Sequence, residues 1–402
     1  MTRAERLRTA LGSLSPRGQA AALGMELDRL RAQLGGLESR HVAALGTGYI
    51  SLAEFQVFNE NNVTELLKPD EFEIFQTAYD VTPGGNWEGH TILNRSQSPM
   101  MDPVTEGKLK ASRDKLLARR AGRIRPGWDD KVLADWNGLM IAALANAGAL
   151  LGDGGWIATA RRAFTFIAAE MTRGDRLGHS WRAERLLFPG LASDFSNMIR
   201  AALALYEATA ERGYLDQAIA WQGALDRHYA NPDNGGYFLT ADDAEGLVVR
   251  PGATSDDATP NPNGIAAQNL VRLAAFTGDH AWREKADRLI EGVLGAAGDH
   301  LIGHASVLNA LDLRLRATEI VVTGSGERAH ALADAALRLP LSTRIVLRAP
   351  NADALPASHP ARDKIAAAPE GAAFVCVGER CSLPVTEGDR LTELAQAMGA
   401  TS

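Results

Sequence analysis

The chain has 402 residues, of which 46% are hydrophobic and 23% are charged, and its formal net charge is -7. This balance is typical of a globular protein with a sizeable core, and it argues against nucleic-acid binding, which needs clustered Lys and Arg. Because the sequence has no long uncharged apolar run, we expect no membrane-spanning segment.

Residues 1–45 predict one or two helices with a polar face, because five leucines recur there at helical spacing. They are Leu23, Leu27, Leu30, Leu34 and Leu37. A helical hairpin that packs on the rest of the chain and a coiled-coil partner helix both fit this pattern. The first residues form no apolar signal core, and the chain has only two cysteines, so we expect a cytoplasmic protein.

Residues 46–124 predict an irregular and helical connection. A turn cluster at Thr82–Asn86 is followed by a helix at Val104–Ala121 that carries several lysines and arginines. We interpret this charge run as a solvated helix face.

Residues 125–316 predict a series of helical hairpins, because apolar residues recur there at helical spacing. The expected pairs are Asp135–Leu151 with Gly155–Met171, Ser193–Ala210 with Tyr214–Tyr229, and Asn263–Phe276 with His280–Leu294, followed by a single helix at Ala305–Leu315. We expect Asp135 to cap the first of these helices.

The short turn inside each pair repeats one pattern, in which a glycine is followed by an aromatic residue and then by an alanine four residues later. The aromatics are Trp156, Tyr214 and Trp282, and the alanines are Ala160, Ala218 and Ala286. Glycine can end the first helix in a left-handed conformation, and alanine lets the partner helix approach. Hairpins of this kind build a solenoid or a closed α/α toroid. The two long loops, Thr172–Ala192 and Asn231–Pro262, should then share one face and carry the site.

Residues 317–402 predict a small parallel α/β unit. The expected strands are Glu319–Thr323, Arg344–Leu347 and Ala373–Val377, with helices near 327–338 and 387–398. Cys376 and Cys381 could pair, but we expect two free thiols, because the sequence offers no further ligands that would complete a metal site.

Four segments carry a family resemblance. Asp129–Met140 resembles a signature of the YyaL-like family of thioredoxin-domain-containing proteins, to which the spermatogenesis-associated members belong. The others are Gly235–Phe238 with Ala241–Asp243 and Arg250–Pro251, then Asp257–Pro260 with Asn263, and lastly Phe374–Cys376 with Pro384–Thr386. The resemblance implies a mainly α fold, part of an (α/α)6 toroid similar to that of N-acylglucosamine 2-epimerases and glycosidases.

The chain also departs from this family. It has no Cys-x-x-Cys motif, which excludes thioredoxin-like activity, and residues 1–60 do not match the family's first hairpins. The chain therefore looks like the C-terminal part of such a protein. An open ring would expose hairpin faces, which we expect the N-terminal helices or a protein partner to cover.

Charged residues near the loops are the first candidates for chemistry. Asp256 and Asp257 could act as paired acid/base groups on a sugar, or could cap a turn and face water. The resemblance places an acidic residue, here Asp194, at the cavity rim, although an N-cap role fits equally. Arg182 and Arg250 could hold hydroxyls or a carboxylate, or form surface salt bridges.

Aromatic and amide residues are the second group of candidates. Trp136 and Asn137 belong to the most distinctive motif, and Trp136 could stack on a sugar or could simply be a core residue. Tyr237 is a loop aromatic, and Asn263 lies in a matching segment. No pair of histidines has metal-ligand spacing, so we expect no metal, and nothing indicates a cofactor.

These observations favour a carbohydrate-binding or carbohydrate-modifying protein, epimerase-like or glycosidase-like, with a sugar or another small molecule as ligand. Two alternatives remain open: a noncatalytic helical-repeat interaction module, and a truncated, inactive derivative of a thioredoxin-domain-containing protein. The sequence does not decide whether the chain is an enzyme.

Overall fold

A computed structural model of the chain describes residues 58, 60–87, 89–98, 100–124, 129–244, 246, 248–297 and 301–400. The chain divides into two compact units, Met1–Asp129 and Asp130–Ser402, and each is described here by itself. The leucine-rich segment predicted within residues 1–45 lies outside the described residues. In the described part, no helix combines the length and apolar character that crossing a bilayer requires.

The first unit contains three described helices, α4 (Glu60–Thr64), α5 (Pro69–Tyr79) and α6 (Pro103–Ala121). Helix α6 is the predicted basic helix, and it begins where the Asp102 carboxylate accepts the backbone N–H groups of Val104 and Thr105. Lys115 on α6 forms an ion pair with Glu71 on α5 at 2.6 Å, so part of the charge run holds the two helices together. The sequence analysis did not identify α5.

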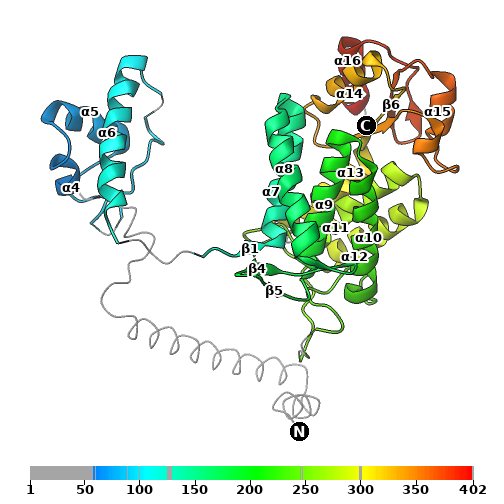
Figure 1. Ribbon diagram of the computed structural model, residues 1–402, viewed down its shortest axis with the longest axis horizontal. Coiled ribbons are helices and arrows are strands. Elements are labelled where there is room, and N and C mark those ends of the chain that lie inside the picture. Colours follow the sequence, from blue (N-terminus) through cyan, green and yellow to red (C-terminus); the bar gives the residue numbers. More distant parts are fainter. Residues whose placement is uncertain are drawn as a thin grey trace, which may run out of the picture. The chain divides into compact units, whose positions relative to one another are not determined.

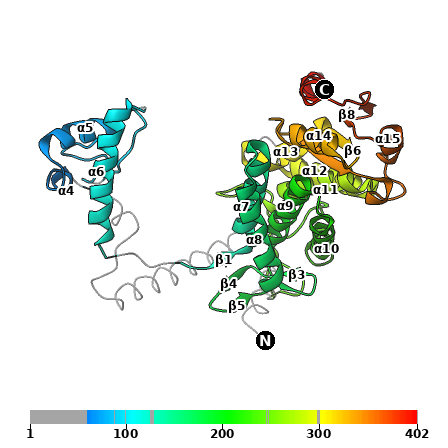
Figure 2. The ribbon, with the colours of Figure 1, turned by 45° about the horizontal axis from the view of Figure 1, so that its top comes forward.

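The second unit is built mainly from helical hairpins (Figure 1). Its helices are α7 (Ala134–Leu151), α8 (Gly154–Glu170), α9 (Ala192–Thr209), α10 (Arg212–Tyr229), α11 (Pro262–Thr277), α12 (His280–Ala297) and α13 (Ala305–Arg316). Helices α7, α9, α11 and α13 pack next to one another in that order and form an inner row, while α8, α10 and α12 return along the outside (Figure 2). The predicted three and a half hairpins are present.

Within the described residues of the second unit, the inner row is an arc rather than a closed ring. Helices α9 and α11 have inner neighbours on both sides and are buried on nearly every face. Helix α7 has an inner neighbour on one side only, and it leaves Trp136 (61% exposed), Met140 (58%) and Leu151 (66%) accessible. The predicted mainly α fold, part of a toroid, is therefore confirmed, and α7 has an apolar face that no described element of the second unit covers.

The turns confirm most of the predicted repeat. Helices α7 and α11 end at Gly152 (φ 73°) and Gly278 (φ 70°), both left-handed. The middle pair differs from the prediction, because α9 ends at Ala210 (φ 60°) and Gly213 lies inside the first turn of α10. The three predicted alanines, Ala160, Ala218 and Ala286, are fully buried where the helices meet.

Helix starts also differ slightly from expectation. Helix α7 begins at Ala134 with Leu133 as its N-cap, so Asp135 lies in the first turn instead of capping it. The motif residue Gly138 has a packing role, because a Cβ there would lie 2.7 Å from the backbone of Asn197 on α9. A glycine at this position therefore lets the two inner helices approach closely.

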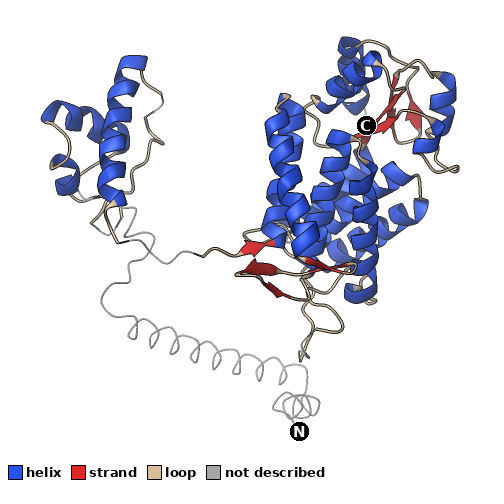
Figure 3. Cartoon of the chain, viewed as in Figure 1, coloured by secondary structure: helices blue, strands red, loops and turns tan. Residues whose placement is uncertain are grey.

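The C-terminal region is an α/β unit with a mixed sheet, whereas the sequence predicted a parallel one (Figure 3). Its elements are β6 (Thr318–Thr323), α14 (Glu327–Leu337), β7 (Arg344–Ala349), α15 (Arg362–Ala367), β8 (Ala373–Val377), β9 (Arg380–Cys381) and α16 (Gly388–Ala400). Strand β6 pairs parallel with β7 but antiparallel with β8. The direction of β8 depends on the path of the connection that contains α15, which local sequence patterns do not show.

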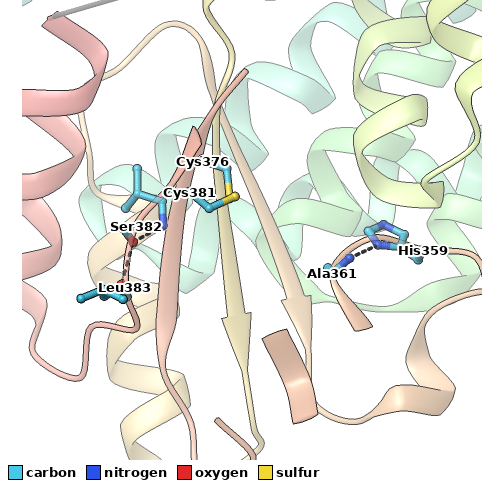
Figure 4. Close-up of a disulfide and its surroundings, with 7 residues drawn as sticks. His359, Ala361, Cys376, Cys381, Ser382 and Leu383 are labelled. Carbon is cyan, nitrogen blue, oxygen red and sulfur yellow. Dashed lines mark hydrogen bonds between the residues drawn. A yellow bond between two sulfur atoms is a disulfide. The ribbon is translucent and has the colours of Figure 1, made fainter. Parts of the chain in front are cut away.

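The prediction of two free thiols is wrong. Cys376 and Cys381 form a disulfide (Figure 4), because strands β8 and β9 pair with these two residues directly opposite each other. Register across a hairpin depends on the turn, and the spacing of the two cysteines did not reveal it. The cytoplasmic location stays a prediction.

The two ends of the hairpins have different surroundings. The long loops gather at one end, where Arg176 of the first loop forms an ion pair with Asp243 of the second at 2.6 Å. The short turns lie at the other end, where the C-terminal α/β unit packs on them: Glu207 on α9 accepts the backbone N–H of Val346 on β7 at 2.9 Å. The prediction that the long loops share one face is therefore confirmed.

Candidate functional site

Short strands in the first long loop position the residues of the candidate site. They are β2 (Thr172–Arg173), β3 (Arg176–Leu177), β4 (Ser180–Arg182) and β5 (Arg185–Leu187), with β1 (Val132–Leu133) before α7 joining β4. His179 lies just before β4, and its backbone carbonyl accepts the N–H of Ala134 at 2.9 Å. The strands thus hold His179 against the beginning of α7.

Asp194 joins three separate segments at this place. Its side chain is completely buried. The carboxylate accepts the backbone N–H of Asp135 at 3.0 Å and that of Leu191 at 2.6 Å, and it lies 3.0 Å from Nδ1 of His179. Because these partners come from the start of α7, the start of α9 and the loop before β4, Asp194 fixes their mutual position. We call Asp135, Trp136, His179 and Asp194 the His179 cluster.

The electrostatics of the cluster follow from its burial. Desolvation raises the pKa of Asp194 to about 6, although the adjacent imidazole acts in the opposite direction. The hydrogen bond with Asp194 raises the pKa of His179, with burial opposing it. Among the described residues, Nε2 of His179 has no partner, and the side chain is 24% exposed. This nitrogen is therefore available to exchange a proton with a ligand.

Asp135 and Trp136 supply the exposed part of the cluster. The Asp135 carboxylate accepts the backbone N–H of Trp136 at 2.8 Å, and the Oγ–H of Ser193 lies 3.4 Å away. The ring of Trp136 is mostly exposed beside it. An exposed indole offers an apolar surface on which a sugar ring can stack.

Two groups of side chains in the described part of the chain could hold a metal ion. Asp135, His179 and Asp194 each offer a ligand atom within 4.8 Å of the others, and so do His228, Asp242 and Asp243. Both oxygens of Asp194 already accept hydrogen bonds, which favours the positioning of His179 over metal ligation. The absence of a metal stays a prediction.

The two neighbouring acids of the second long loop, Asp256 and Asp257, have different surroundings, and their acid/base role stays a prediction. The Asp256 carboxylate accepts the backbone N–H groups of Asn261 and Ser306, both at 2.8 Å, and so fastens the starts of α11 and α13. Burial raises its pKa, but the hydrogen bonds from Asn261 and Ser306 outweigh this effect and leave the pKa below its usual value. Asp257 is exposed.

Three more predicted candidates hold the second loop in shape. Asn263 is buried and donates to the carbonyls of Tyr237 and Ala253. Tyr237 is also buried, and its hydroxyl donates to Asp226 at 2.6 Å. Arg250 donates to the carbonyls of His228 and Thr240 and lies 4.4 Å above the Phe238 ring. These contacts position the loop that neighbours the cluster.

The last two candidates lie near the cluster but make local contacts. Asn137 donates to the carbonyl of Leu133, the N-cap residue of its helix, at 2.9 Å. Arg182 forms an ion pair with Asp130 in which both side chains are more than half exposed. Of the predicted residues, the structure thus brings Asp194 and Trp136 together in the cluster. The sequence analysis missed His179, because its partner comes from another element and sequence spacing does not show it.

Curated relatives match much of the chain. It is 28% identical over 340 residues to spermatogenesis-associated protein 20 of Homo sapiens, covering 78% of this chain and 43% of that protein. It is 31% identical over 222 residues to the Mus musculus protein of the same name, covering 50% of this chain and 28% of that protein. The chain is similar to spermatogenesis-associated protein 20. It spans less than half the length of these relatives, and no protein-family model matches it.

Solved structures show a more distant likeness. A GH76 α-mannanase of Bacteroides thetaiotaomicron has a TM-score of 0.39 at 11% identity, covering 60% of this chain and 75% of that chain. A cellobiose 2-epimerase of Bacillus thermoamylovorans has a TM-score of 0.36 at 9% identity, covering 48% and 63%. Because these scores are low, the likeness carries no argument about the activity of this chain.

Proposed function

We propose that the chain binds a carbohydrate at the His179 cluster and modifies it by proton transfer. The supporting observation is the completely buried Asp194, which holds Nδ1 of His179 and also accepts the backbone N–H of Asp135, the residue before the exposed Trp136. A carboxylate that fixes one imidazole nitrogen orients the other for general acid or base catalysis. Trp136 would hold the sugar by its apolar face.

The same geometry favours epimerase-like over glycosidase-like chemistry. Glycoside hydrolysis usually needs two carboxyl groups that flank the scissile bond. Of the two carboxylates in the cluster, Asp194 is buried and accepts three hydrogen bonds, so it cannot reach a substrate. Removal and return of a proton at a sugar carbon needs one base and one acid, for which His179 and Asp135 are the available groups.

The test is a thermal-shift panel of mono- and disaccharides, followed by turnover measurements on any sugar that raises the melting temperature. We expect Trp136→Ala to weaken binding of that sugar by on the order of tenfold, and His179→Gln to abolish turnover while leaving binding in place. Trp156→Ala and His228→Gln are the matched controls, since both residues lie outside the cluster. A panel without any response, or equal loss in the controls, would refute the proposal.

A second candidate function is a noncatalytic interaction module, which the uncovered face of α7 favours. Trp136, Met140 and Leu151 are all more than half exposed on this helix. Such a patch is typical of a protein–protein contact. A flat sugar panel, together with a captured protein partner that Met140→Glu releases, would favour this candidate over the first.

A further inference from the structure

A cavity lies in the C-terminal part of the second unit, and none of the residues of the His179 cluster lines it. It measures about 370 Å³ and lies between the α11–α12 turn and the mixed sheet. Gly278 and Arg283 line it on the helical side, and Glu319 and Lys364 on the other. Both cysteines of the disulfide, Cys376 and Cys381, are also part of its wall.

Two further acids, Asp279 and Glu379, also line this cavity, and the Asp279 carboxylate accepts the backbone N–H of Ala281 at 2.9 Å. In the part of the chain that the structure describes, the side chains of Glu319, Arg283 and Lys364 form no hydrogen bond or ion pair. Burial raises the pKa of Glu319, while the positive charges of Arg283 and Lys364 act against this rise. Three acids and two cations thus line a shared space, in which Glu319, Arg283 and Lys364 do not neutralise one another directly. This arrangement suits a small ligand that carries charged groups of its own.

His359 also lines the cavity, but its two ring nitrogens already have partners. Nδ1 accepts the backbone N–H of Ala361 at 3.0 Å, as Figure 4 shows, and Nε2 lies 3.2 Å from the carbonyl of Ala275. Burial lowers the pKa of His359. The histidine therefore holds the wall in place and leaves ligand contacts to the charged groups.

The disulfide contributes little to the stability of the fold at this position. Strands β8 and β9 are already paired, and the backbone N–H of Ser382 donates to the carbonyl of Val375 at 2.8 Å. The bond closes only the short segment between Cys376 and Cys381, and short closed loops restrict the unfolded chain least. Cys381 is exposed on a two-residue edge strand, whereas Cys376 is 7% exposed. An accessible sulfur in a disulfide is open to attack by a thiol.

We propose that this cavity binds a low-molecular-weight thiol bearing a carboxylate, and that the thiol exchanges with the Cys376–Cys381 disulfide in its wall. Arg283 and Lys364 hold the carboxylate, and Glu319 accepts an ammonium group where the thiol has one. The site is independent of the function proposed for the His179 cluster.

The exchange balances in two steps. The incoming thiolate bonds to Sγ of the exposed Cys381, the S–S bond breaks, and its electron pair leaves on Cys376, which takes up the proton that the small thiol released. A second molecule of the thiol then attacks the mixed disulfide and releases Cys381 as a thiol. Two small thiols are oxidised to their disulfide, and the protein disulfide is reduced to two thiols.

Four thiols test the proposal on the native, full-length chain. L-Cysteine and N-acetylcysteine carry a carboxylate, whereas cysteamine and 2-mercaptoethanol do not. The rate at which protein thiols appear is measured for each reagent and divided by the concentration of its thiolate, which is the attacking species. We expect the two carboxylate thiols to react on the order of tenfold faster and to reach saturation. The double variant Arg283→Gln/Lys364→Gln should remove this advantage, whereas Arg212→Gln, which breaks an exposed ion pair with Asp216 on α10, should keep it. Glu319→Gln should slow L-cysteine but not N-acetylcysteine.

The site of attack has its own readout. Acid quenching followed by peptide mass spectrometry should find the mixed disulfide on Cys381. Equal rates for all four thiols, an adduct on Cys376, or thiol release only after denaturant unfolds the chain would each overturn the proposal. None of these measurements uses carbohydrate activity, so the result stands apart from that of the sugar panel.

Discussion

At the scale of single residues, burial decides what each acidic side chain of the long-loop face does. Asp194 is completely buried and holds His179, Asp256 is partly buried and joins two helix starts, and Asp257 is exposed. Three aspartates on the long-loop face thus have three different surroundings. A sequence shows the acids but not their burial, which depends on how distant segments pack.

The Asp194–His179 pair predicts a pH dependence of stability. The folded-state pKa of Asp194, about 6, is above its usual value, and that of His179 is also raised, so the folded state holds more protons. The pair's contribution to the free energy of unfolding is therefore full near pH 4 and falls as the pH rises through 6 and beyond. We expect Asp194→Asn to remove most of this slope, which amounts to at most about 3 kcal/mol for Asp194.

Urea unfolding at a series of pH values measures this effect. NMR titration of His179 should show a lower pKa in Asp194→Asn, because its partner is then neutral. Asp257→Asn is the matched control, since this side chain is exposed. If the slope persists in Asp194→Asn, another group produces it.

The candidate site could be predicted only in part. The sequence motif pointed to Trp136, and the helix that follows the first long loop pointed to Asp194. His179 could not be found in this way, because only the pairing of β1 with β4 places it against α7. Asn263 and Arg250 were predicted to bind a substrate, which stays a prediction, and in the structure their hydrogen bonds hold the second long loop.

At the scale of elements, periodicity located the helices of the second unit to within a few residues at either end, because one apolar face per helix is a local signal. Strand direction was not accessible in the same way. The chain around α15 gave no sign that β8 runs against β6, since that depends on the path of a connection. The disulfide between Cys376 and Cys381 was missed for a similar reason, because β9 exists only through its pairing with β8, which local sequence patterns do not show.

The middle turn offers a stability test. Ala210 has a left-handed backbone (φ 60°) that costs an alanine more than a glycine, and the other two turns use Gly152 and Gly278 there. We expect Ala210→Gly to raise the free energy of unfolding by about 0.5–1 kcal/mol, after allowance for the greater freedom of glycine in the unfolded chain.

Chemical denaturation followed by tryptophan fluorescence measures this change. The reverse substitution, Gly278→Ala, should lower the free energy of unfolding by more than about 1 kcal/mol. The alanine would have to adopt the same left-handed backbone conformation, and its Cβ would also lie 3.0 Å from Cα of His359. A decrease in stability for Ala210→Gly would show that the Ala210 methyl group makes packing contacts that outweigh the strain.

At the scale of the whole second unit, a buried charge fastens the hairpins to the α/β unit. Glu207 is 5% exposed, and it accepts hydrogen bonds from the Val346 backbone and, at 3.2 Å, from Arg272. Arg348 on β7 adds a bond to the carbonyl of Ala208. The last turn of α9 is thereby tied to strand β7, more than a hundred residues later in the chain.

This contact predicts a large effect for a single substitution. Glu207→Ala leaves the cation of Arg272 and a strand N–H without their partner, so we expect a loss of about 3 kcal/mol in the free energy of unfolding. Glu393→Ala breaks an exposed ion pair with Arg390 and should cost less than about 1 kcal/mol. Guanidinium titrations of both variants provide the comparison, and similar losses in the two would refute the fastening role of Glu207.

The inner row has one further consequence. Helices α7, α9, α11 and α13 all start at the long-loop face, so the positive poles of four aligned peptide dipoles converge there. Asp135, Asp194 and Asp256 place negative charge against those poles. Replacing one of these aspartates by alanine would therefore leave backbone N–H groups at a helix start without their acceptor and the partial positive charge there unopposed.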